Sequence, residues 1–366
     1  RMYPRRLRIF AAIAAAILLS IPAANLALRG YLGGALWPRE TRDLWSLDRV
    51  EGNLAYLLMS CCETSLAPDR VRIGREGYLF LGDKFEDVMH KTSGAWQPPE
   101  GLIDARAAQL ARLQRRIESA GATLTVAIAP NKHSVYPEML PEDVTPAPQT
   151  TTDDVIARAA EAGLSILDLR PVLQRLKPSV QVYMQTDTHW TRAAAAVAYD
   201  SHMEALRDSS GAADTPIRYS LEPVQRPAGD LAGLLKMQDL YAADFETDYT
   251  IQFETPLNSC IAEINVLSGV EGACVPTASG EVSAGRSVQV TRTAGAPNEQ
   301  TLLMLCDSFC HAGSSLFTAS FTTVYHAHWK HLDDTALERH LAAFAPDIVI
   351  LQMVERDVAI FSLGRE

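Results

Sequence analysis

The chain has 366 residues, of which 47% are hydrophobic and 21% charged, enough for one large α/β domain or two smaller ones. This composition excludes a disordered chain, collagen and a small disulfide-dense protein. The formal net charge is −11, and because the first thirty residues hold five Arg and no acidic residue, the remainder carries −16. The acidic charge of the chain after residue 30 argues against nucleic acid as the main partner, because phosphate binding depends on clustered Lys and Arg.

The N-terminal segment is long and apolar enough to cross a membrane. Twenty residues from Ile9 to Leu28 carry no charge and would span roughly 30 Å as a helix. Four Arg precede this run and one follows it, which favours a cytoplasmic N-terminus and a body on the far side. The alternative is a cleaved signal peptide, which the small residues at 23, 24 and 27 would permit. We predict an uncleaved single-span anchor over residues 1–30, followed by a juxtamembrane segment over 31–70.

Apolar periodicity and the placement of Gly and Pro predict the elements of the remaining domain, residues 71–366. In chain order they are a β-hairpin over 72–83, a helix over 102–120, a strand over 123–130, a helix over 152–163, a strand over 165–169 and helices over 171–177 and 192–207. A turn-rich insertion with extra β-structure is predicted around 209–300. A strand over 301–306, a helix over 312–320, an extended segment over 322–329, a helix over 334–344 and a strand over 347–354 complete the pattern. Alternating strands and helices imply a mainly parallel sheet flanked by helices.

Four of the six cysteines have positions that suggest a pairing. Cys260 and Cys274 close a short excursion that contains Gly and Ser, and an extracytoplasmic location would permit a disulfide between them. Cys306 and Cys310 bracket a serine. A bond between this second pair would act as a redox switch, which requires that activity is lost on oxidation and restored by a reductant.

A candidate nucleophile lies at the end of the strand predicted over 301–306. The apolar run leads directly into Asp307 and Ser308, so the serine hydroxyl would be exposed at a tight turn beyond the sheet. The backbone N–H of Ser308 would then lie where a tetrahedral oxyanion forms. The alternative is that either residue only caps the following helix.

A candidate base lies in the segment Thr186-Asp187-Thr188-His189-Trp190-Thr191. Imidazole has the pKa that is needed to take a serine proton, and a carboxylate two residues earlier can orient the ring and stabilise its charged form. In the alternative, Thr191 caps the next helix and Asp187 is a surface acid near the helix N-terminus, where negative charge is favoured. His189 would then be an incidental loop residue.

Six segments occur in an order that resembles a known family: GREGYLFLGD, IAPNKHSVYPEMLP, TDTHWT, AGDLAGLL, CDSF and ERD. Together they resemble the SGNH-hydrolase-like domain of the alginate O-acetyltransferase family, of the AlgJ/AlgX type, over about residues 70–366. The resemblance implies a flavodoxin-like α/β fold in permuted order. It also implies that Asp187 is the orienting acid, His189 the general base and Ser308 the nucleophile.

Two departures from the family pattern affect this interpretation. Cys306 stands where SGNH enzymes usually have glycine, and its side chain could narrow the oxyanion pocket. The sequence also ends soon after the ERD segment, which leaves no room for the C-terminal carbohydrate-binding module of the AlgX type. With its N-terminal apolar segment, the chain resembles the membrane-anchored AlgJ type more.

The resemblance implies a two-step acetyl transfer, through an ester on Ser308, to a hydroxyl of an exopolysaccharide. It implies no tightly bound cofactor. The acetyl group would come ultimately from acetyl-CoA through a membrane-bound O-acyltransferase (MBOAT) partner, and the domain would lie in the periplasm, anchored in the bacterial inner membrane. The acidic body favours a neutral polymer such as a glucan over alginate itself.

Five further residues in the family-like motifs are candidates for substrate binding. Asn131 and Gly229 are candidates for the second oxyanion donor, and Lys132, Tyr136 and Arg356 are candidates for lining the cleft. For each of the last three, the alternative is a structural role in an ion pair or a packed aromatic cluster.

Three other functions compete with the transferase. An acetyl esterase would use the same three residues, and a non-catalytic polysaccharide-binding or scaffold subunit would keep the fold without activity. A metal site is the third, because His326, His328 and His331 crowd together. Since no acid or Cys at convincing spacing completes that set, we expect no metal and interpret these as ordinary histidines.

Overall fold

The computed structural model describes residues 3–31, 45–212, 217–265, 269–282 and 287–364. Its helices are α1 (Tyr3–Tyr31), α2 (Asp48–Cys62), α3 (Val88–Ser93), α4 (Leu102–Ser119), α5 (Lys132–Val135), α6 (Thr151–Glu161), α7 (Arg170–Leu176), α8 (Arg192–Ser210), α9 (Asp230–Leu234), α10 (Ser314–Ser320) and α11 (Asp334–Phe344). Its strands are β1 (Val71–Ile73), β2 (Leu79–Leu81), β3 (Thr123–Ala129), β4 (Ile166–Asp168), β5 (Tyr219–Arg226), β6 (Glu246–Phe253), β7 (Ser259–Ile264), β8 (Val275–Thr277), β9 (Val288–Thr293), β10 (Asn298–Cys306), β11 (Phe321–His328) and β12 (Ile348–Val354).

The central element is an eight-stranded sheet of order β4-β3-β12-β10-β11-β9-β7-β8. The first five strands pair in parallel, and the last three extend the sheet in antiparallel fashion. The parallel part matches the alternation of strands and helices in the sequence. The antiparallel strands come from the turn-rich insertion, so the sheet is mixed.

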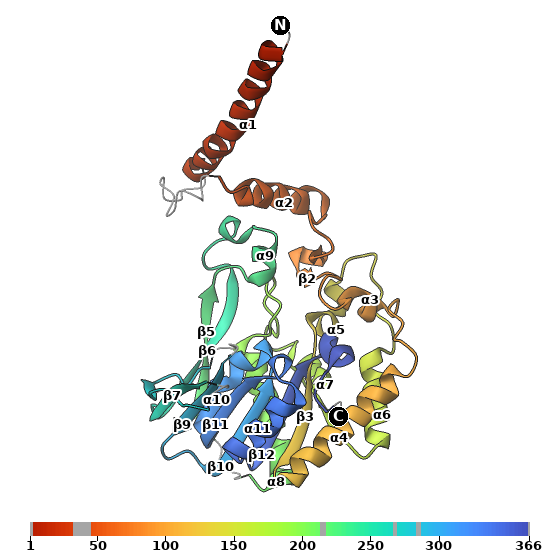
Figure 1. Cartoon of the computed structure of the whole chain (residues 1–366), viewed down its shortest axis with the longest axis vertical. Helices are drawn as coiled ribbons and strands as arrows, with labels where there is room; N and C mark the ends of the chain where they lie inside the picture. The colour runs from red at the N-terminus through yellow and green to blue at the C-terminus, as the bar shows by residue number, and fades with distance from the viewer. Residues whose placement is uncertain (1–2, 32–44, 213–216, 266–268, 283–286, 365–366) are drawn as a thin grey trace.

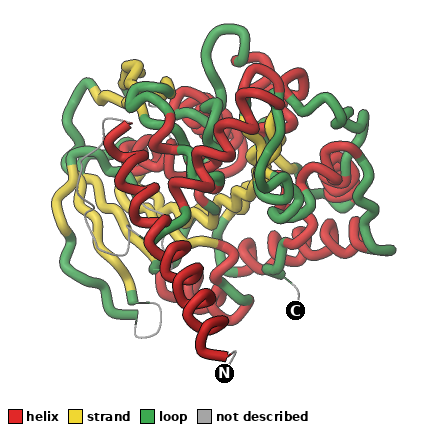
Figure 2. The backbone as a smooth tube through the Cα atoms, turned by 90° about the horizontal axis from the view of Figure 1, so that it is seen from above, coloured by secondary structure: helices red, strands yellow, loops and turns green. Residues whose placement is uncertain are grey.

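Helices cover both faces of the parallel strands, because successive strand side chains point to opposite sides. On β10, Leu303 and Leu305 pack with side chains of α4, α6 and α11. Leu302, Met304 and Cys306 point the other way and pack with α8 and α10. Viewed from above, the antiparallel strands extend the sheet at the left (Figure 2). A doubly covered sheet explains why its strands read as continuous apolar runs.

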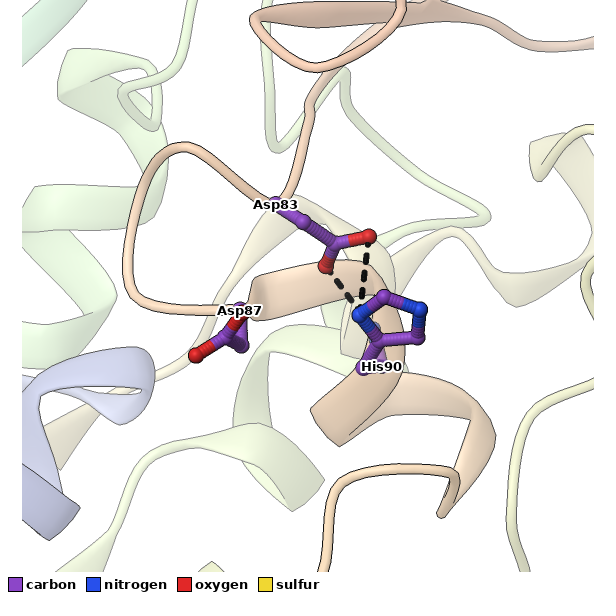
Figure 3. Close-up of side chains that lie close together, drawn as sticks. All are labelled: Asp83, Asp87 and His90. Atoms are coloured by element: carbon purple, nitrogen blue, oxygen red, sulfur yellow. Dashed lines mark hydrogen bonds and ion pairs between the residues drawn. The ribbon is translucent and has the colours of Figure 1, made fainter.

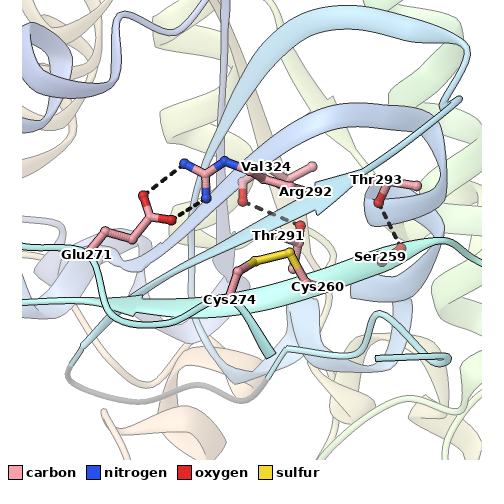
Figure 4. The surroundings of a disulfide bond; sticks show 8 residues. All are labelled: Ser259, Cys260, Glu271, Cys274, Thr291, Arg292, Thr293 and Val324. Carbon is pink, nitrogen blue, oxygen red and sulfur yellow. Dashed lines mark hydrogen bonds and ion pairs between the residues drawn. A yellow bond between two sulfur atoms is a disulfide. The ribbon is translucent and has the colours of Figure 1, made fainter. Parts of the chain in front are cut away.

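The insertion forms two structures. β5 and β6 pair as a separate antiparallel ribbon, whereas β7, β8 and β9 join the sheet edge. Cys260 on β7 and Cys274 just before β8 form a disulfide, as predicted, with the Arg292–Glu271 ion pair beside it (Figure 4). The bond therefore fastens the outermost strand to the sheet.

At the N-terminal end, residues 9–27 of α1 form an apolar stretch with a mean hydropathy of 2.2, long enough to cross a membrane. Helix α2, which we did not predict, lies crosswise between the lower end of α1 and the α/β body (Figure 1). Part of the predicted juxtamembrane segment, residues 32–44, lies outside the described residues. The divisions at residues 30 and 70 stay predictions.

Candidate active site

Three neighbouring parallel strands deliver polar residues to one edge of the sheet. Ser308 follows β10, Arg356 follows β12 and Asn131 follows β3, and these strands lie side by side in the order β3-β12-β10. The carboxyl ends of parallel strands are where ligand sites form in open α/β sheets.

The turn that carries Ser308 is fixed by the residue before it. Asp307 Oδ1 accepts from the N–H of Phe309 (3.0 Å), and Oδ2 accepts from the N–H of Val354 (2.7 Å), which ties the ends of β10 and β12 together. Asp307 thus caps the short helix η5 (Ser308–Gly313). Since Ser308 is the first residue of that helix, its N–H has no acceptor within the helix, as is usual for the first N–H groups of a helix. The capping and nucleophile interpretations are compatible.

The loop before α8 meets this turn. His189 Nδ1 lies 2.8 Å from Asp187 Oδ1, and His189 Nε2 lies 2.8 Å from Ser308 Oγ. The side chains of His189 and Asp187 are 32% and 16% exposed, so the site is open to solvent at the imidazole while the carboxylate is mostly covered. Thr191 does cap α8, accepting from the N–H of Ala194 (3.3 Å), but Asp187 is not a surface acid. Hydroxyl, imidazole and carboxylate form a continuous hydrogen-bonded chain.

The AGDL turn supports Asp187 from behind. The N–H of Asp230 donates to Asp187 Oδ2 (3.2 Å), and the N–H of Gly229 donates to Thr186 Oγ1 (2.8 Å). A Cβ on Gly229 would lie 2.4 Å from Asp187 Cβ and 2.5 Å from its Oδ2. Only glycine lets the turn approach the carboxylate so closely. Glu246, buried on β6, accepts in turn from the N–H of Thr186.

A second carboxylate also faces the imidazole. Asp230 Oδ2 lies 3.6 Å from His189 Nδ1, and its Oδ1 accepts from the N–H of Thr188 (2.7 Å). Burial and the charge of Asp187 raise the pKa of Asp230. Burial disfavours the His189 imidazolium, but the hydrogen bond and charge of Asp187, with the charge of Asp230, outweigh it and raise the pKa of His189. We did not single out Asp230, although it lies in the quoted AGDL segment.

An aromatic residue next to the nucleophile joins the two loops. The ring of Phe309 packs against those of His189 (5.1 Å between centroids) and Trp190 (5.4 Å), and its carbonyl accepts from Trp190 Nε1 (2.9 Å). The Arg356 guanidinium lies 5.7 Å from the Phe309 ring centroid. Trp190 and Phe309 were in the quoted motifs, but their sequence positions do not indicate this contact.

The interior contacts of Lys132 and Tyr136 favour the structural alternative for both, although Lys132 also lines a small cavity with Asn131, Thr188 and Arg356. Lys132 is 3% exposed, and its ammonium donates to the carbonyls of Leu79 (3.0 Å) and Gln185 (3.2 Å). Burial lowers its pKa to about 8. Tyr136 is 5% exposed, and its hydroxyl accepts from the N–H of Val182 (3.0 Å). Both side chains support the loop that carries Asp187 from inside.

The two candidates for the second oxyanion donor have committed backbone N–H groups. That of Gly229 donates to Thr186, and that of Asn131 donates to Glu355 Oε2 (2.9 Å). The Asn131 side-chain oxygen accepts from Arg356 (3.2 Å). Neither backbone N–H is therefore available as the second oxyanion donor. The side-chain amide of Asn131 stays a candidate for that role, and Asn131 and Arg356 both line the groove described next.

A groove of about 370 Å³ is lined by residues that include Asn131, Arg356, Gln174 and Arg170. Ser308 is not among its lining residues. Arg356 connects the two features, because its guanidinium also lies over Phe309 beside the nucleophile.

Among the described residues, two clusters have the side chains and spacing of metal ligands. His326, His328 and His331 belong to neither cluster. One is the Asp187–His189–Asp230 group itself. In the other, Asp83 accepts from the N–H groups at the start of α3 and pairs with His90 (3.1 Å; Figure 3). Its geometry is that of a helix cap.

Cys306 and Cys310 are both buried and unbonded to each other. Burial raises the pKa of the Cys310 thiol, whose sulfur accepts from Gln352 Nε2 (3.3 Å). A buried thiol with a raised pKa is poorly reactive. The redox switch stays a prediction.

The fold and this chain of contacts define an SGNH-hydrolase-like protein. A family model described as "SGNH hydrolase-like domain, acetyltransferase AlgX" matches residues 71–260. The chain belongs to this family.

Curated relatives include two proteins named probable alginate O-acetylase AlgJ. The Pseudomonas putida protein is 29% identical over 178 residues, which cover 47% of this chain and 43% of the relative. The Pseudomonas aeruginosa protein is 30% identical over 122 residues, covering 33% and 29%. The matched part therefore spans less than half the length of these relatives.

Solved structures show the same fold. Bacillus cereus PatB1 aligns with a TM-score of 0.56 at 14% identity, covering 77% of this chain and 95% of that one. The O-acetyltransferase domain of Pseudomonas putida AlgJ aligns with a TM-score of 0.51 at 21% identity, covering 80% and 93%.

Proposed function

We propose that the protein is an extracytoplasmic O-acetyltransferase that moves an acetyl group through a serine ester onto hydroxyls of an exopolysaccharide. The observation that carries this proposal is the pair of 2.8 Å contacts that join Asp187, His189 and Ser308. Membership of the family supports the acetyl group as cargo.

In the first step, Ser308 Oγ attacks the acetyl carbonyl of the donor while its proton passes to His189 Nε2. Asp187 holds the ring so that Nε2 faces the hydroxyl, and its negative charge stabilises the imidazolium. The Ser308 N–H meets the oxyanion. Collapse of the tetrahedral adduct forms the acetyl ester and expels the leaving group, which takes the proton from His189.

In the second step, a sugar hydroxyl occupies the place of the leaving group. His189 Nε2 removes its proton as the sugar oxygen attacks the acetyl-serine carbonyl. Expulsion of Ser308 Oγ, reprotonated by His189, releases the acetylated sugar and restores the enzyme. One imidazole serves both steps. In each step it takes the proton of the attacking hydroxyl and then gives a proton to the oxygen of the leaving group.

The groove lined by Asn131 and Arg356 is the site that we propose for the polysaccharide chain, because Arg356 also lies over the Phe309 ring, next to the nucleophile in the sequence. A net charge of −11 favours a neutral polymer over a polyuronate.

α1 would anchor the domain on the periplasmic side of the bacterial inner membrane. Acetyl-CoA is cytoplasmic, so the acetyl group must cross the bilayer, and an MBOAT partner would supply it. No cofactor needs to be bound tightly for either step.

Two assays separate this function from its rivals. With a chromogenic acetyl ester as donor and a panel of defined oligosaccharides, a transferase forms acetylated sugar in preference to free acetate, whereas an esterase releases acetate regardless of the sugar. A non-catalytic subunit would give neither product, and a serine-directed probe would label the wild type and Ser308→Ala equally.

A further inference from the structure

Helix α2 has two apolar faces, and only one of them packs on the domain. Gly52 and Ala55 are buried against the body, and a Cβ on Gly52 would lie 2.0 Å from the Lys236 carbonyl, just beyond α9. Met59 and Tyr241 continue this contact, with the tyrosine hydroxyl 3.6 Å from the sulfur. The inner face is therefore fixed closely to the segment that follows the AGDL turn.

The opposite face is exposed and apolar. Leu47, Val50, Leu54 and Leu57 are 48%, 40%, 44% and 59% exposed. Their spacing of three, four and three residues places them on one side of the helix. Trp45, 50% exposed, precedes them. A stripe of this kind on a helix that is already packed on its other side indicates a second apolar environment.

The position of α2 relative to α1 indicates what that environment is. The Asn25 amide donates to the Ser46 carbonyl (2.7 Å), directly before α2, and Asn25 is fully buried. Asn25 lies three residues before Leu28, so it is about 5 Å along the helix from the end of the apolar stretch. Ser46 is therefore held at the level where the hydrocarbon of a bilayer would end. α2 runs crosswise there (Figure 1).

We propose that α2 is an interfacial helix that lies in the headgroup layer of the outer leaflet, with Leu47, Val50, Leu54 and Leu57 inserted. This inference rests on the proposed membrane anchor. Helices of this kind bury their apolar face ~5–10 Å into the boundary of headgroups and acyl chains, and Trp at the position of Trp45 is typical of that layer. Exposed Asp48 and Glu51 favour insertion that does not depend on anionic lipids.

The arrangement has a consequence for the active site. The inner face of α2 contacts the segment after α9, and α9 begins at Asp230, which faces His189. A helix fixed in the membrane surface would thus set the height and orientation of the active site above the bilayer, where a membrane partner delivers the acetyl group.

The test is a depth measurement on the full chain in phosphatidylcholine nanodiscs. A spin label is placed at Leu57→Cys, or at Leu54→Cys should the first variant not fold, after Cys61 and Cys62 are changed to Ser. Power saturation then gives the ratio of collisions with oxygen to collisions with a water-soluble nickel complex. Val275→Cys, at a position 63% exposed near the sheet edge, is the aqueous reference. Leu18→Cys on α1 is the lipid reference.

We expect the ratio at Leu57 to be several-fold above that at Val275 and below that at Leu18. A ratio equal to that at Val275, with Leu18 in lipid, would overturn the interfacial helix and leave the anchor intact. Few collisions with either oxygen or the nickel complex would mean that protein covers the exposed apolar face of α2, which also overturns the proposal. An aqueous value at Leu18 would reject the anchor itself.

Discussion

At the residue scale, His189 is unusual because two carboxylates face it. Asp187 Oδ1 lies 2.8 Å and Asp230 Oδ2 3.6 Å from the same ring nitrogen, while the Arg356 charge acts in the opposite sense. Both acids favour the imidazolium, which is the form that arises when Ser308 gives up its proton. Asp187 orients the ring through a hydrogen bond, whereas Asp230 contributes mainly charge.

This arrangement predicts how the pH dependence of activity changes in Asp230→Asn. His189 is a base only when neutral, so activity rises with pH through its pKa, which lies above the ordinary 6.5. Removal of the Asp230 charge lowers that pKa, and the rise in kcat/KM therefore moves to lower pH. pH–rate profiles of the variant, the wild type and a control at the exposed acid, Asp244→Asn, measure the shift. If kcat/KM rises at the same pH in Asp230→Asn as in the wild type, the charge of Asp230 does not act on His189.

Gly229 provides a second test at this scale. The methyl group of Gly229→Ala would overlap the Asp187 carboxylate and displace it from His189. A misplacement of about 1 Å costs on the order of 10²-fold in rate. Gly272→Ala is the matched control, because its Cβ would meet nothing closer than 3.4 Å. Equal kcat/KM for both variants would show that the AGDL turn does not position Asp187.

The contacts of Asp187, His189 and Ser308 could be predicted because the roles of an acid, a base and a nucleophile need those residue types, and because the order of the motifs resembles a family in which they act together. For Lys132, burial of the ammonium favours a structural role over direct contact with substrate. A motif shows which residues occur together, but not whether a side chain points outward or into the interior, and here two carbonyl groups take up the ammonium.

At the element scale, the parallel strands could be predicted from their continuous apolar runs. Their order in the sheet could not, because it depends on which helix crosses which face. Helix α2 was missed because its apolar residues are distributed over two opposite faces, which weakens the one-sided periodicity that indicates a helix in a globular domain.

The disulfide at the sheet edge is expected to affect stability without affecting catalysis. Cys260 and Cys274 are 14 residues apart, and closing a loop of that length stabilises a fold by about 3 kcal/mol. Replacing both with Ser should lower the denaturant midpoint and leave kcat/KM unchanged, because β11 and β9 separate β7 from β10. A loss of activity in the folded variant would show that this edge communicates with Ser308.

At the scale of the whole molecule, the active site is assembled from two segments that lie 119 residues apart in sequence. The parallel sheet brings Ser308 to its carboxyl edge, the packing of α8 on β10 brings the His189 loop to the same edge, and the AGDL turn completes the support. The sequence order of the motifs indicated the family, but the distances between them required the folded chain.

The most direct test of the central claim is to trap the acetylated enzyme. The full chain is mixed with a chromogenic acetyl ester without a sugar acceptor, quenched in acid and digested, and its peptides are weighed. We predict one acetyl group on the peptide that contains Ser308, with release of the chromogen reduced by about 10³-fold or more in Ser308→Ala and in His189→Ala. Two results would contradict this mechanism. One is release of the chromogen by the wild type without an acetyl group on the Ser308 peptide, and the other is release by Ser308→Ala at the rate of the wild type.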